Sequence, residues 1–184
     1  MCRIHILGAS GSGTTTLGVA VADLLAVPHV DTDAVYWLAT DPPFTTPRPI
    51  PERIALLREK LPLSCGWVLS GSAISWAQPF EPLYNLIVYL WLDPVLRMER
   101  LRLRERTRYG RRVDSGGDMA ISSADFLAWA AAYDTAGREQ RSRVAHEEWL
   151  AGQRAPIIRL NSAEPVHVLA DAVLSSISNI ISHP

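Results

Sequence analysis

Apolar and polar positions alternate along this chain in blocks that predict strands and helices in turn. Short apolar runs predict buried strands at residues 3–7, 65–69, 84–92 and 156–160, with a brief strand at 29–30. Apolar residues at helical spacing predict helices at about 15–25, 52–61, 94–108, 123–134, 138–151 and 165–181. Continuous apolar strands that alternate with helices indicate an α/β fold with a parallel sheet covered on both faces.

One segment interrupts this alternation. Residues 41–51 contain five prolines, which predict a stiff, extended loop: Pro42, Pro43, Pro47, Pro49 and Pro51. No internal repeat, low-complexity tract or linker divides the sequence. We therefore expect residues 1–184 to form a single domain, which is long enough for a sizeable core.

A glycine-rich stretch directly follows the first predicted strand. Gly8 and Gly13 lie five residues apart, as in the phosphate-binding pattern GxxxxGK[ST], and Thr15 occupies the Ser/Thr position of that pattern. A strand, a glycine turn and a helix N-terminus together present backbone N–H groups to an anion. The lysine of the pattern is absent, because Thr14 stands in its place.

Two aspartates, Asp31 and Asp33, follow the brief second strand. Carboxylates at this position can hold Mg²⁺ through waters or bind a substrate hydroxyl. Asp and Thr also favour turns and helix caps without any ligand. The local sequence leaves both interpretations open, and the neighbouring glycine loop favours the functional one.

The helix predicted at 94–108 and the loop after it are rich in arginine. Eight arginines between Arg97 and Arg112 are accompanied by only two acidic residues, Glu99 and Glu105. Arg97, Arg100, Arg104 and Arg108 recur at helical spacing and share one face. A solvated basic face is the usual explanation of such a run. The shortage of local acids instead favours anionic ligands, and phosphates above all.

Composition narrows the function classes. The net charge of −1 implies no general attraction to nucleic acid or to an anionic membrane, although the chain has 17 Arg and one Lys, Lys60. The two cysteines show neither a disulfide framework nor metal-ligand spacing. No stretch resembles a signal peptide or a membrane span. We expect a cytoplasmic protein with small-molecule partners, as a monomer or a homodimer.

In the order of its parts the chain resembles the adenylate-kinase-like P-loop kinases of small molecules, a group that includes nucleoside monophosphate, shikimate and gluconate kinases. It is most similar to bacterial kinase-like proteins of the topology-modulation type, which share the aspartate pair followed by an aromatic residue and a late basic loop ending near Asp118-Met119. The resemblance implies a three-layer α/β/α P-loop NTPase fold with a five-stranded parallel sheet. It also implies an arginine-rich lid at about 104–122, an acceptor-side segment at about 38–62, and ATP or another nucleoside triphosphate with Mg²⁺.

The resemblance also implies site residues. The nucleotide is expected to contact the loop and the start of its helix: Gly8, Ala9, Ser10, Gly11, Ser12, Gly13, Thr14, Thr15 and Thr16. Thr15, Asp31 and Asp33 are expected to hold Mg²⁺, and Asp33 to orient the acceptor oxygen. Asp31, Asp33, Arg53 and Gly71 are assigned to the acceptor. Arg104, Arg108 and Arg111 are expected to stabilise the transferring phosphoryl group, with Arg112, Arg138 and Arg141 contacting phosphates.

Two departures from the family pattern leave the activity open. Thr14 replaces the lysine, and Ser70 replaces the aspartate that usually ends the third strand of nucleotide kinases. Three hypotheses remain: a kinase in which lid arginines replace the lysine charge, a nucleotide-binding regulatory module with little catalysis, and an α/β protein in which the glycine loop is only a tight turn. The nature of the acceptor is left open, as is the choice between ATP and GTP.

Overall fold

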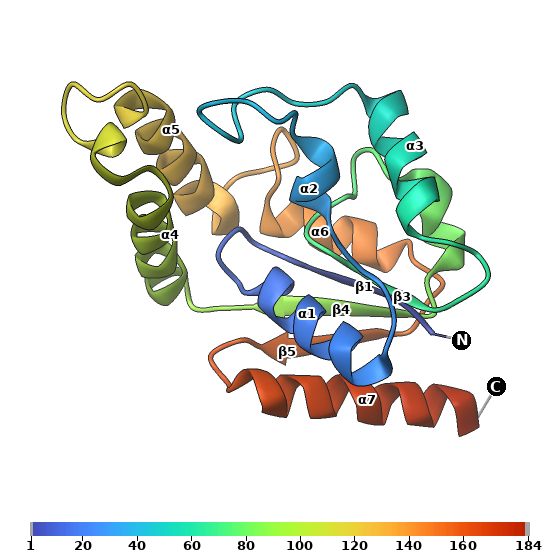
Figure 1. Ribbon diagram of the computed structural model, residues 1–184. Helices are drawn as coiled ribbons and strands as arrows, with labels where there is room; N and C mark the ends of the chain where they lie inside the picture. Colours follow the sequence, from blue (N-terminus) through green and yellow to red (C-terminus); the bar gives the residue numbers. More distant parts are fainter. Residues whose placement is uncertain (1, 183–184) are drawn as a thin grey trace.

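The computed structural model describes residues 2–182 and has three layers, with a parallel sheet between two layers of helices (Figure 1). Within these residues the sheet has five strands in the order β2-β3-β1-β4-β5. The strands are β1 (Arg3–Gly8), β2 (His29–Asp31), β3 (Trp67–Ser70), β4 (Leu86–Trp91) and β5 (Ile157–Asn161). All strand pairs are parallel. The predicted α/β class and five-stranded parallel sheet are confirmed.

Hydrophobic burial explains why the strands lie at the centre of the fold, between the two layers of helices. Every residue of β3 is buried, and so are the residues of β1 after Arg3. Residues of this kind stabilise a sheet by roughly 1.5–3 kcal/mol for each fully buried large side chain. Only a sheet covered on both faces removes such uniformly apolar strands from water.

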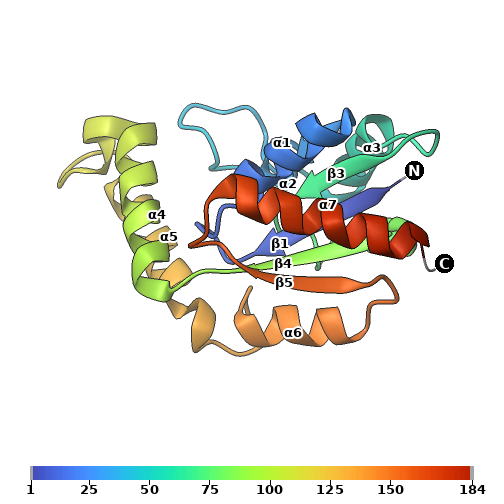
Figure 2. The same ribbon diagram turned by 90° about the horizontal axis from the view of Figure 1, so that it is seen from below.

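Each face of the sheet has its own core. On one face α1 (Thr14–Leu25) and α7 (Val166–Ser182) lie side by side, and Leu17, Val21 and Val173 pack beneath them (Figure 2). On the other face lie α3 (Ile50–Lys60), α6 (Arg143–Ala151) and the 3₁₀ helix η1 (Gln78–Leu83). Their core includes Leu57 and Leu150.

A helical arm, α4 (Pro94–Tyr109) and α5 (Ala120–Ala131), extends past the end of the sheet at which the glycine loop lies (Figures 1 and 2). Short 3₁₀ helices η2 (Gly110–Val113) and η3 (Ala132–Asp134) flank α5. Asp93 caps α4 by accepting hydrogen bonds from the Val95 and Leu96 amides. Buried Arg97 donates to the Ala130 carbonyl and pairs with Asp134, so this arginine of the basic face is structural.

The structure adds elements that hydrophobic periodicity did not predict. A short helix, α2 (Thr32–Tyr36), follows the first of the two aspartates, η1 lies between β3 and β4, and η2 occupies part of the loop predicted after 94–108. The helix predicted at 138–151 begins only at Arg143, because the Ser142 hydroxyl accepts the Ala145 amide as its N-cap. No helix within the described range is long and apolar enough to cross a membrane.

Candidate active site

The loop after β1 has the geometry of a phosphate cradle. A Cβ on Gly8 would lie 2.5 Å from the Leu90 carbonyl oxygen, so only glycine fits there. Gly11 and Gly13 adopt φ values of 85° and 89°, in the left-handed region that favours glycine. Helix α1 starts at Thr14 with no side-chain cap. Its first amides are therefore left for a ligand, at the positive end of the helix dipole.

Two cavities meet at this loop, with volumes of about 740 and 570 Å³. We call the first the donor cavity and the second the acceptor cavity, names that express proposed roles and not observed ones. Both are lined by Gly11, Thr14, Thr15, Asp31, Asp33, Phe44, Arg104 and Arg108. The donor cavity is also lined by Ser12, Gly13, Thr16, Arg100, Leu101, Ser162, Glu164, Val166 and Leu169. The acceptor cavity is also lined by Gly8, Ala9, Ser10, Tyr36, Gly71, Ser72, Met119, Trp129 and Arg141, among others. Every loop residue expected at the nucleotide thus lines a cavity.

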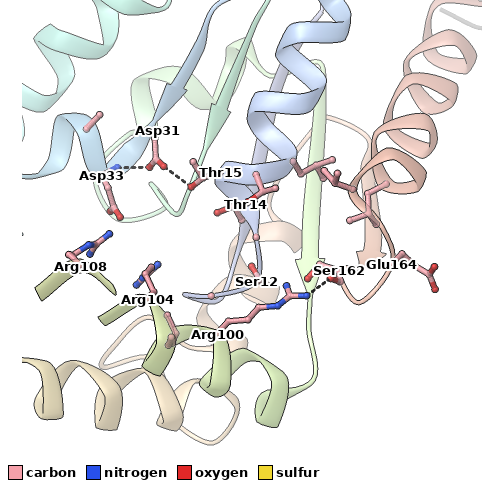
Figure 3. A pocket seen from close by; sticks show the side chains of 18 of the residues that line it. Ser12, Thr14, Thr15, Asp31, Asp33, Arg100, Arg104, Arg108, Ser162 and Glu164 are labelled. Carbon is pink, nitrogen blue, oxygen red and sulfur yellow. Dashed lines mark hydrogen bonds between the residues drawn. The ribbon is translucent and has the colours of Figure 1, made fainter. Parts of the chain in front are cut away.

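The structure shows the helix-capping role of the aspartate pair, and the metal or substrate role stays a prediction. The Asp31 side chain caps α2, because its Oδ1 accepts a hydrogen bond from the Asp33 amide nitrogen at 2.9 Å. Its other oxygen accepts the Thr15 hydroxyl at 2.6 Å, which joins β2 to the first turn of α1 (Figure 3). Asp33 lies open to both cavities, but their walls displace bulk water. This burial, together with the neighbouring Asp31 charge, raises the pKa of Asp33, and Arg141, Arg104 and Arg108 partly oppose the rise.

Arginines from α4 reach the cleft from the side opposite the aspartates. Figure 3 shows Arg104 and Arg108 directed toward Asp31 and Asp33. The Arg104 Nε is buried and finds no hydrogen-bond partner in the described part of the chain, and burial lowers the pKa of Arg104. Arg100 was not assigned a role from the sequence. Its Nη1 would lie 3.9 Å from a Cβ on Gly13, and its Nη2 donates to the Ser162 carbonyl. The sequence indicated a site role for Arg100 only through its helical spacing, which places it on the same face of α4 as Arg104 and Arg108.

Other arginines assigned to phosphates lie outside both cavities. Arg112 pairs with Asp118 and Asp41, and Arg138 pairs with Glu148. Arg111 is exposed on η2. Arg53, assigned to the acceptor, is buried, donates to the Arg48 carbonyl and lies 3.7 Å over the Tyr36 ring. The roles given to these four residues stay predictions, whereas Arg141 does line the acceptor cavity.

The end of β3 lies between the cleft and a buried series of hydrogen-bonded side chains, Ser72, His146 and Tyr133. Ser70, in the position of the missing aspartate, is fully buried and hydrogen-bonded to His29 at 2.9 Å, so it does not line either cavity. Gly71 follows with φ 95°. Ser72 lines the acceptor cavity, and its hydroxyl bonds to His146 at 3.0 Å. The same imidazole contacts the Tyr133 hydroxyl at 2.7 Å, and burial lowers the pKa of His146 to about 3.

Three contacts join α4 and η2 to the proline-rich loop. The Arg108 guanidinium lies 3.9 Å over the Phe44 ring. The Tyr109 hydroxyl donates to the Pro43 carbonyl at 3.0 Å, and Arg112 pairs with Asp41 at 2.8 Å. Phe44 adopts a positive φ of 62°, an uncommon conformation for a bulky residue and one often found at functional sites. We call these contacts the lid–loop latch.

Comparisons with known proteins bear on the family and on the fold. No family model matches the chain. YqaC, an uncharacterized protein of Bacillus subtilis strain 168, is 44% identical over 177 residues, which cover 96% of this chain and 98% of the relative.

Solved structures of low sequence identity have a similar fold. A gluconokinase from Sinorhizobium meliloti 1021 superposes with a TM-score of 0.56 at 15% identity, covering 97% of this chain and 93% of the other. Shikimate kinases from Aquifex aeolicus and Bacteroides thetaiotaomicron give TM-scores of 0.54 and 0.53 at 12% and 18% identity. They cover 99% and 96% of this chain, and 99% and 98% of their own. The chain therefore belongs to the family of Bacillus subtilis YqaC, and its fold is that of the P-loop small-molecule kinases.

Proposed function

We propose that this protein is an ATP-dependent phosphotransferase that uses Mg²⁺ and acts on a small molecule. One observation carries the proposal. Arg104 and Arg108 line both cavities and form no ion pair among the described residues, although Asp31 and Asp33 lie close enough to perturb the pKa of Arg104. Guanidinium groups that converge on a cleft without carboxylate partners favour a polyanionic ligand such as a nucleoside triphosphate.

The oxygen donors at the end of β2 fit Mg²⁺. Thr15 and Asp31 already share a hydrogen bond, and a hydroxyl and a carboxylate are hard ligands of the kind that Mg²⁺ prefers. Within residues 2–182 no cluster of three or more His, Cys, Asp or Glu residues could hold a metal alone. Phosphate oxygens and waters would complete the shell, as is usual for Mg²⁺. When bound, the ion would neutralise phosphate charge.

Side chains and backbone amides of the protein would bind the phosphates, accept the proton and stabilise the transferring charge. The amides at the start of α1 would bind the phosphates of ATP in the donor cavity, where the buried Ser12 hydroxyl has no partner in the part of the chain described. Asp33 would accept a hydrogen bond from the acceptor hydroxyl, and its raised pKa suits it to take that proton. Arg104 and Arg108 would supply the charge that Thr14 lacks. Phosphoryl transfer depends mainly on such positioning and charge stabilisation.

A comparison of arginine variants tests the proposal. Mg·ATP affinity is measured by calorimetry and turnover by ADP release, with and without added acceptors. Arg104→Met and Arg108→Met are each expected to reduce turnover by about 100-fold, the usual order for one charge-stabilising group. Arg102→Met is the matched control, because Arg102 is exposed on the same helix and lines neither cavity. Equal turnover in all three variants would refute the role of these arginines.

The absence of the loop lysine supports a second candidate, a nucleotide-binding regulatory module. Backbone amides can bind phosphate without a lysine, so binding can persist where catalysis is lost. Thr14→Lys separates the two functions. If the protein is a kinase, the lysine is expected to change turnover by less than about 10-fold, since arginines already supply the charge. Tight Mg·ATP binding without turnover for any acceptor, together with turnover created by Thr14→Lys, would favour the module.

A further inference from the structure

A line of hydrogen-bonded side chains begins at the acceptor cavity and ends at β4. The Ser72 hydroxyl lies 3.0 Å from Nε2 of His146, whose Nδ1 lies 2.7 Å from the Tyr133 hydroxyl. The Tyr133 hydroxyl in turn lies 2.9 Å from that of Tyr89. We call Ser72, His146, Tyr133 and Tyr89 the buried series, because all four side chains are buried. Of these four residues Ser72 lines the acceptor cavity, so the series connects that cavity to the core.

Four separate elements hold the members of the buried series in place. His146 lies in α6, and Ser72 follows the end of β3. Tyr133 lies in η3, and the Arg97 guanidinium lies 5.2 Å over its ring. Tyr89 lies in β4, which pairs with β1 on one side and with β5 on the other. The distances between the four polar groups are therefore set by the fold.

The number of hydrogens in the buried series is fixed at neutral pH. Burial and, to a smaller extent, the nearby Arg141 charge lower the pKa of His146 to about 3, so the imidazole is neutral and carries one N–H. Burial raises the pKa of Tyr133 and that of Tyr89, so both keep their hydroxyl hydrogens. With the hydroxyl of Ser72 the series has four hydrogens for three hydrogen bonds. One hydrogen therefore has to find an acceptor outside the series.

The Tyr89 end of the series offers this hydrogen no acceptor. Among residues 2–182 the Tyr89 hydroxyl has no hydrogen-bond partner other than Tyr133. The nearby Glu147 carboxylate pairs with Arg159 instead. A buried hydroxyl hydrogen without an acceptor is costly, whereas the Ser72 hydroxyl lies at a cavity that water or a ligand can enter. The hydrogen bonds are therefore expected to run from Tyr89 toward Ser72, with the remaining hydrogen directed into the cavity.

We propose that His146, as its Nε2–H tautomer, holds Ser72 as a hydrogen-bond donor to the acceptor cavity, so that Ser72 selects molecules with an oxygen rather than an ammonium group beside it. This inference rests on the proposed phosphotransfer. Ser72 and Asp33 both line the cavity, just beyond the ends of the paired strands β3 and β2. An ionised carboxylate only accepts hydrogen bonds, whereas Ser72 donates one, so a hydroxyl or carbonyl oxygen satisfies Ser72. An ammonium group has no lone pair and leaves the Ser72 hydrogen unpaired.

Nitrogen NMR of the imidazole side chains measures the tautomer in the protein without any ligand. The signals of His146 are those that His146→Gln lacks. Near neutral pH the Nε2–H form is expected to exceed the Nδ1–H form by at least about 5-fold, because the reverse arrangement leaves the Tyr89 hydrogen unpaired. Tyr133→Phe removes the donor to Nδ1 and is expected to lower this ratio several-fold. Tyr84→Phe is the matched control and is expected to keep the ratio, because Tyr84 is buried in the same core outside the series.

Matched acceptor pairs test the selection itself. Each pair replaces one hydroxyl by an ammonium group: glycerate against serine, glycerol against 2-aminopropane-1,3-diol, and glucose against glucosamine. ADP release with Mg·ATP is expected to be at least about 10-fold faster, as kcat/KM, for the hydroxyl member of at least one pair. Ser72→Ala is expected to raise the KM of that member about 10-fold with a smaller change in kcat, and to remove the preference. A preference that persists in Ser72→Ala would assign it to another charge of the cavity, such as Arg141, and overturn the inference.

Replacements of His146 separate a positioning role from general support of the fold. His146→Gln keeps a side-chain N–H that can donate to Ser72, and is expected to keep the acceptor KM within a few-fold of the parent. His146→Leu has no such donor and is expected to match Ser72→Ala. Ser175→Ala is the control, because Ser175 is exposed on α7 and lines neither cavity.

The result that overturns this inference differs from the one that overturns the proposed function. A dominant Nδ1–H form of His146 would refute the orientation of Ser72 while the kinase stands. The tautomer ratio decides this even where no member of the three pairs is phosphorylated. Failure to bind Mg·ATP, measured by calorimetry without any acceptor, would instead refute the phosphotransferase itself.

Discussion

Acidification is expected to destabilise this protein through two buried imidazoles, His5 and His146. His5 stacks on Tyr84 at 4.9 Å, and its Nδ1 lies 3.2 Å from the Leu69 carbonyl oxygen. Burial lowers the pKa of His5 to about 4 and that of His146 to about 3, from 6.5 in the unfolded chain. Both rings are therefore neutral in the folded protein at a pH where they are charged once unfolded.

The sign and the size of the change in the free energy of unfolding with pH follow from proton linkage. Below about pH 6.5 the unfolded chain binds more protons than the folded protein, so the free energy of unfolding falls as the pH falls. Integrated from about pH 6 to about pH 4.5, the loss is about 2 kcal/mol for each ring, or about 4 kcal/mol for the two. This is a large share of the 5–15 kcal/mol that holds a typical domain together.

Denaturant unfolding over this pH range measures the effect, and a variant isolates one ring. His146→Asn is expected to be less stable than the parent at neutral pH, because it disturbs the contacts with Ser72 and Tyr133. That deficit is expected to shrink by about 2 kcal/mol by about pH 4.5, since asparagine does not titrate. His167→Gln, an exposed position on α7, serves as the control and keeps the parental slope. Parallel pH profiles for His146→Asn and the parent would refute the reasoning.

Three further substitutions probe the cleft. Gly71→Ala is expected to destabilise the fold by about 2 kcal/mol or more, because its Cβ would lie 2.0 Å from the Thr32 hydroxyl oxygen at a φ of 95°; equal denaturation midpoints would contradict this. Thr15→Val is expected to weaken Mg·ATP binding about 10-fold while leaving Mg²⁺-free binding unchanged, and calorimetry with EDTA distinguishes the two effects. Asp41→Asn breaks the exposed pair with Arg112 and is expected to raise acceptor KM a few-fold without moving the melting temperature. Unaltered kinetics would remove that pair from the latch.

Local patterns predicted the layers of this fold because burial decides them. The apolar runs at 3–7 and 84–92 correspond to β1 and β4, and the glycine spacing located the loop that both cavities share. Helix α2 was not predicted, because five residues are too few to show a helical period and its start depends on one hydrogen bond that the Asp33 amide donates to the Asp31 side chain.

Which arginines reach the cleft depends on contacts between distant residues. Arg112 and Arg104 belong to one basic run, but Arg112 pairs with Asp41, 71 positions away, while Arg104 finds no such partner among residues 2–182. The same applies to Arg53, which is drawn inward by the Tyr36 ring. A sequence lists charges without their partners, so it predicted that arginines gather here but not which of them remain free.

The lid–loop latch has a kinetic consequence. Phe44 lines both cavities and supports Arg108, which lines both as well. A nucleotide that draws Arg108 away from the ring also releases the loop that borders the other cavity. Loosening of this loop is expected to weaken acceptor binding, as in Asp41→Asn, so the two substrates of the proposed reaction are expected to bind with antagonism, and the KM of each rises as the concentration of the other rises. Initial-rate plots would then intersect to the left of the ordinate and below the abscissa.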